Sequence, residues 1–85
     1  MKKTTDPREA AQALQDDKIV KMSLGGRQWT VNAISEGVDA WIAKISHRDF
    51  LHSRVETLAI HEFSVYSQAE YRSMIDALRE SEENL

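Results

Sequence analysis

Four stretches of the chain alternate between apolar and polar residues, with the two-residue period of a strand that has one buried face. They span residues 20–24, 28–33, 41–45 and 55–63. Gly25-Gly26 joins the first two stretches and is a strong signal for a tight hairpin. Because the connections are short, the pattern predicts a four-stranded antiparallel β-meander.

The last of these stretches has a second interpretation. Leu51, Val55 and Leu58 also fit the spacing of a helix, so the sequence leaves open whether residues 50–63 are strand or helix. We favour a strand because β-branched and aromatic residues are frequent here. A helix would also run directly into the helix start at Ser67.

A helix is predicted before the first strand, over residues 7–17. Asp6 is a suitable cap, Pro7 is tolerated at the first helical position, and Glu9 completes a capping box. The apolar stripe of this helix is weak, so we expect it to pack lightly or to fray. The stripe consists of Ala10, Ala11 and Leu14.

A second helix is predicted from the capping box Ser67–Glu70 onward. Its apolar stripe has the spacing i, i+3, i+4, i+7 and is expected to cover the core face of the sheet. The stripe consists of Tyr71, Met74, Ile75 and Leu78. The acidic residues near its end oppose the helix dipole, so residues 81–85 are expected to fray, as are residues 1–5.

The predicted fold class is therefore α+β, with the order α-β-β-β-β-α and one domain over residues 1–85. Strict alternation would place five apolar residues on the face opposite the core, among charged neighbours, where we expect a protein interface. They are Ile19, Ile34, Ile42, Leu58 and Ile60. The N-terminal helix, a second copy of the chain or a different protein are the alternatives for covering them.

The composition indicates the cellular compartment of the protein and excludes several classes of function. There are no cysteines, which favours a reducing environment, and no apolar run approaches the ~18 residues that span a bilayer. The first residues lack the apolar stretch of a signal peptide. We therefore expect a cytoplasmic protein without membrane contact.

No recognised catalytic or cofactor motif is present in the sequence. His61-Glu62 begins like a zinc-protease motif, but Val65 stands where the second histidine would be. His47, Asp49 and His52 do not have a recognised ligand spacing. We predict no enzyme activity, no metal, no cofactor and no small-molecule substrate.

The function expected is that of a small non-catalytic protein-binding or regulatory module, an adaptor or inhibitor, acting through the sheet face or as a homodimer. The alternative is single-stranded nucleic-acid binding, in which basic residues on the sheet would act together with Trp29 and Trp41. The basic residues are Lys21, Arg27, Lys44, Arg48 and Arg54. A net charge of −3 counts against this alternative.

Overall fold

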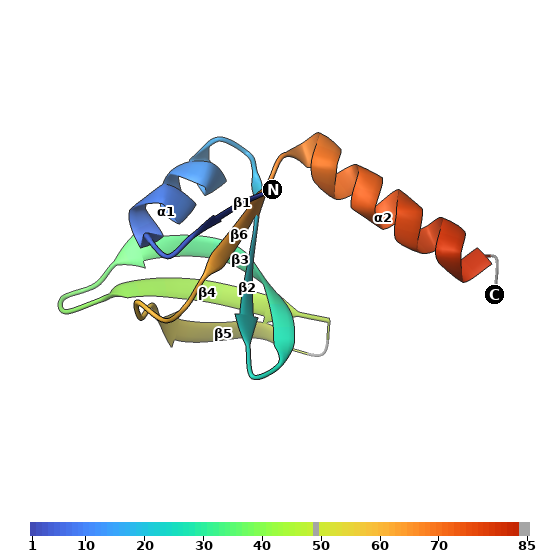
Figure 1. The fold of residues 1–85 in the computed structure, drawn as a ribbon. Helices are drawn as coiled ribbons and strands as arrows, with labels where there is room; N and C mark the ends of the chain where they lie inside the picture. Colours follow the sequence, from blue (N-terminus) through green and yellow to red (C-terminus); the bar gives the residue numbers. More distant parts are fainter. Residues whose placement is uncertain (49, 84–85) are drawn as a thin grey trace.

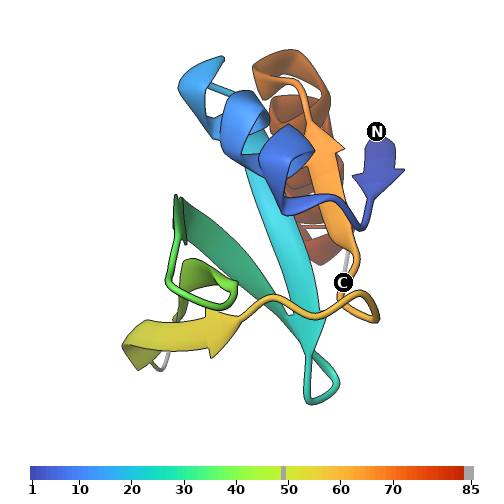
Figure 2. The ribbon, with the colours of Figure 1, turned by 90° about the vertical axis from the view of Figure 1, so that its left-hand side faces the viewer.

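The chain forms an antiparallel sheet with one helix on each side, as Figures 1 and 2 show. The computed structural model describes residues 1–48 and 50–83, with the backbone alone at 50–52 and 83. The elements are β1 (Lys2–Thr4), α1 (Pro7–Gln15), β2 (Ile19–Leu24), β3 (Arg27–Glu36), β4 (Trp41–His47), β5 (Phe50–Glu56), β6 (Phe63–Tyr66) and α2 (Gln68–Glu83).

The strand order within the described residues is β1-β6-β2-β3-β4-β5. Strands β2 to β5 follow one another as a meander, although β5 covers residues 50–56 and not the predicted 55–63. Strand β6 returns to pair with the free side of β2, and β1 then pairs with β6. The α+β class is confirmed, whereas a sheet of only four strands is wrong. With three residues, β1 is too short to show an alternating pattern, and it was expected to fray.

The predicted strand over residues 55–63 is wrong because the chain leaves the sheet in its middle. The backbone N–H and the hydroxyl of Thr57 both donate to the carbonyl of Trp41, at 2.8 and 3.2 Å, and end the pairing of β5. A turn follows, closed by a bond of 2.9 Å from the N–H of His61 to the carbonyl of Leu58. The alternating stretch therefore belongs to two strands, β5 and β6, that flank a loop.

The hairpin between β2 and β3 forms as predicted. Gly25 and Gly26 have φ angles of 60° and 76°, the positive values that favour glycine in a tight hairpin turn. Further along β3 the register with β4 shifts between Val31 and Ala33. This irregularity reverses the alternation, so Ile34 lies on the core side, opposite Ala43.

Helix α1, and not α2, covers the core face of the sheet. Ala10 and Ala13 are 0% and 6% exposed, because their small side chains let the helix approach the strands closely. The buried cluster comprises Ala10, Ala13, Val20, Met22, Trp29, Val31, Ala43, Ile45, Phe63 and Val65. The sequence-based assignment of the two helices was therefore wrong: the helix with the weaker stripe is the one that packs.

Helix α2 starts at the end of β6, on the side of the sheet opposite α1, and extends away from it (Figures 1 and 2). Its 16 residues correspond to about 24 Å. The radius of gyration is 13.7 Å, whereas a compact chain of this length has about 12 Å. Neither helix of the described part of the chain has the length and apolar character of a membrane-spanning segment.

Candidate protein interface

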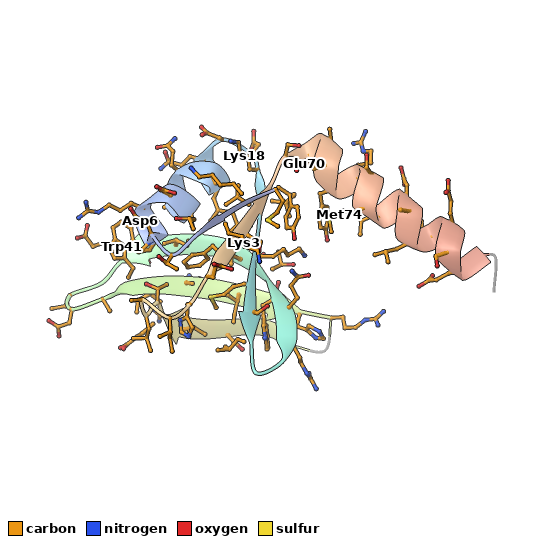
Figure 3. The ribbon with its side chains drawn as sticks, viewed as in Figure 1. Lys3, Asp6, Lys18, Trp41, Glu70 and Met74 are labelled. Carbon is orange, nitrogen blue, oxygen red and sulfur yellow. The ribbon has the colours of Figure 1, made fainter. Side chains whose placement is uncertain are left out.

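The apolar stripe of α2 is largely uncovered. Met74 and Leu78 are 40% and 60% exposed, while Tyr71 and Ile75 are partly buried. Figure 3 shows α2 beyond its first turns with side chains reaching no other element, and Met74 labelled among them. An amphipathic helix in water normally buries its apolar side, so this stripe is the most conspicuous candidate site of the described chain.

The start of α2 is fixed on the sheet by a small second cluster. Tyr66 points away from the α1 side, and its ring lies 6.1 Å from the ring of Tyr71. The Nζ of Lys21 lies 4.9 Å from the centre of the Tyr71 ring, and Gln68 donates to the carbonyl of Asp17 at 2.6 Å. All of these contacts involve the first turn of α2.

Glu70 completes the capping box that the sequence predicts. Its carboxylate accepts from the N–H of Ser67, and its own N–H donates to the Ser67 hydroxyl, both at 3.1 Å. The same carboxylate forms an ion pair with the α-amino group of Met1. The bond to this amino group and the two bonds to Ser67 lower the pKa of Glu70 from 4.5 to about 2.

This pKa predicts how acid affects the start of α2. Because the pKa of Glu70 is lower in the folded chain, its stabilising contribution is complete above pH 4.5 and is lost as the pH falls toward about 2. We expect an NMR titration of the Glu70 side chain to give this low midpoint. Acetylation of the Met1 amine should move the midpoint back toward 4.5. An unchanged midpoint after acetylation would contradict the role of the ion pair.

Charged residues flank the apolar stripe asymmetrically. A hollow of about 390 Å³ runs along one side of α2. It is lined by Gln68, Tyr71, Arg72, Ile75, Asp76 and Arg79.

Glu82 follows Leu78 by four residues and so continues the stripe, whereas Glu80 lies on the opposite side of the helix. The stripe therefore ends in a carboxylate.

The five apolar residues predicted as one interface do not share a face. Ile19 and Ile42 lie on the side opposite α1, while Ile34 packs against the core because of the register shift in β3. Leu58 and Ile60 lie in the loop between β5 and β6 and are 52% and 83% exposed. The single apolar sheet face predicted from strict alternation is therefore wrong.

The predicted nucleic-acid residues are brought together only in part. Lys44 and Arg54 are directly opposite each other on neighbouring strands, on the same outer face as Lys21. Arg27 and Arg48 adjoin the turns at the ends of β3 and β4.

The two tryptophans do not provide a stacking surface beside these basic residues. Trp29 is buried on the α1 side and donates its indole N–H to the carbonyl of Leu24 at 3.2 Å. Trp41 is partly buried and shares the parity of Ala43 and Ile45, so it also faces the α1 side.

A second hollow, of about 200 Å³, lies between β1 and α1. Lys2 and Glu9 line it and form an ion pair, with 3.5 Å between the Lys2 Nζ and the Glu9 Oε2. No histidine borders this hollow. In the described part of the chain no three histidine, aspartate or glutamate residues are grouped to hold a metal. Asp49 and the side chain of His52 lie outside the described residues.

Sequence reasoning found the stripe of α2 but assigned it to the core. The signal that distinguishes the two helices is side-chain size, because the small alanines of α1 let that helix approach the sheet closely.

Comparison with known proteins adds no assignment: no protein family, no curated protein and no solved structure matches the chain.

Proposed function

We propose that the protein is a non-catalytic protein-binding module whose binding element is the apolar side of α2. The observation that carries this proposal is the exposure of Met74 and Leu78 on a helix whose described contacts with the sheet lie at its start. Helices that present apolar residues at this spacing bind grooves or other helices, and the residues act as anchors.

The surface area supports the proposal. The chain exposes 6235 Å², whereas a compact monomer of 9.7 kDa exposes about 5,100 Å². The excess of about 1,100 Å² is comparable with the ~800 Å² that each partner buries in a standard protein interface. The extended shape thus leaves sufficient area for a specific contact without any rearrangement of the sheet.

Site-specific photocrosslinking in cells tests the proposal. A photoreactive amino acid placed at Leu78 should form an adduct with a protein, because this position lies on the apolar stripe. The matched control carries the same group at Glu80, on the opposite side of the helix, and should form little adduct. Met74→Glu should abolish the Leu78 adduct while the circular dichroism spectrum is retained, since Met74 is already 40% exposed.

Equal adduct yields at the two positions, or none at Leu78, would contradict the proposed role of the apolar side. So would an adduct at Leu78 that persists in the Met74→Glu variant.

A further inference from the structure

We infer that the partner of α2 is a second copy of this chain, and that the two α2 helices pack antiparallel with Glu82 of each copy facing Lys21 of the other. This inference rests on the proposed function and specifies its partner. Two-fold pairs of identical chains use the same surface on both subunits, so the surface must be complementary to itself.

The apolar stripe meets this condition. Its four residues are arranged symmetrically about the point between Met74 and Ile75, with Tyr71 three residues before this pair and Leu78 three residues after it. An antiparallel pair centred there places Tyr71 of one copy against Leu78 of the other. Met74 of each copy then lies level with Ile75 of the other, and the whole stripe is covered by one symmetric contact.

Charge decides the direction of the pair. Residues 76–83 carry four acidic residues and one arginine, so the second half of α2 has a net charge of −3. A parallel pair would place these two acidic ends side by side. An antiparallel pair places each acidic end beside the start of the other helix, where the helix dipole is positive.

The pair also gives a partner to two charges that have no ion pair within the described chain. With the centre between residues 74 and 75, Glu82 is level with residue 67 of the other copy, at the anchored end of its α2. Lys21 lies at that end, in contact with the ring of Tyr71, and its other described partner is the neutral Thr30, at 2.6 Å. The carboxylate that ends the stripe is therefore complementary to the lysine at its beginning.

Charge reversal tests this inference by sedimentation velocity over a concentration series. The wild-type chain should sediment at twice its 9.7 kDa mass. Lys21→Glu and Glu82→Lys should each raise the dissociation constant about tenfold, because two symmetric pairs become repulsive. The double variant restores both pairs with reversed sign and should recover most of the affinity. Glu80→Lys makes the same charge change on the opposite side of the helix and should have little effect.

The outcomes separate this inference from the proposed function. A monomeric wild type, or a double variant no tighter than the single variants, overturns the antiparallel pair. If Leu78 then forms a crosslinked adduct with a different protein, α2 is still a protein-binding element and only the partner is wrong. If the wild type is monomeric and Leu78 forms no adduct, both proposals fail. Circular dichroism of each variant distinguishes loss of association from loss of fold.

Discussion

Ala10→Glu is expected to destabilise the domain by about 3–5 kcal/mol, which is most of the stability of a small domain. Ala10 is fully buried where α1 meets the sheet, and no buried polar or charged residue lies in the described core. A carboxylate there would have no partner and no space. Urea unfolding followed by circular dichroism measures the loss.

Ala77→Glu provides the matched control, because it makes the same substitution on α2. Ala77 is exposed, and the change should alter the free energy of unfolding by no more than about 0.5 kcal/mol. The comparison tests which helix covers the core. A tolerant Ala10 combined with a sensitive Ala77 would show that α2, and not α1, packs on the sheet.

Phe63→Ala is the second substitution with a large expected effect, about 3–5 kcal/mol. Phe63 is 0% exposed and lies on β6, between Thr4 of β1 and Met22 of β2. Removing its ring leaves a cavity that the surrounding strands cannot fill. Chemical denaturation monitored by tryptophan fluorescence reports the loss, since Trp29 belongs to the same buried cluster.

Ile60→Ala is the control for this prediction. Ile60 is 83% exposed in the loop between β5 and β6, so its truncation should cost less than about 0.5 kcal/mol. If residues 55–63 formed one continuous strand, alternation would place Ile60 on the sheet face opposite Phe63, among the apolar residues of the predicted interface, and not in a loop. Equal losses at Phe63 and Ile60 would contradict the loop.

Local patterns predicted the local parts of the fold. The Gly25-Gly26 turn and the Ser67 cap depend on backbone requirements that a few neighbouring residues satisfy. The alternating stretches 20–24, 28–33 and 41–45 correspond to β2, the start of β3 and β4, in which buried residues alternate. Alternation failed after Val31, where one extra residue in β3 reverses the faces, because such an irregularity depends on pairing with β4 and leaves no mark in hydrophobicity.

The candidate site was predictable in its residues but not in its role. Periodicity shows that Met74 and Leu78 share one side of a helix, and it does not show what covers that side. The role depends on which of the two helices packs on the core face of the sheet. Ala10 and Ala13 are buried where α1 meets the sheet, although the larger apolar residues of the α2 stripe led to the opposite prediction.

The anchoring of α2 by its first turn has a consequence for cooperativity. The later turns share few contacts with the sheet, so they can open without exposing the core around Phe63. A helix of this length is only marginally stable in water without tertiary packing. Amide hydrogens in the last turns of an unpartnered α2 therefore exchange with solvent by local opening, far faster than those of β2 and β6. Binding along the apolar stripe converts this independently melting segment into part of one cooperative unit, and its amides then become protected to the extent that the contact is stable.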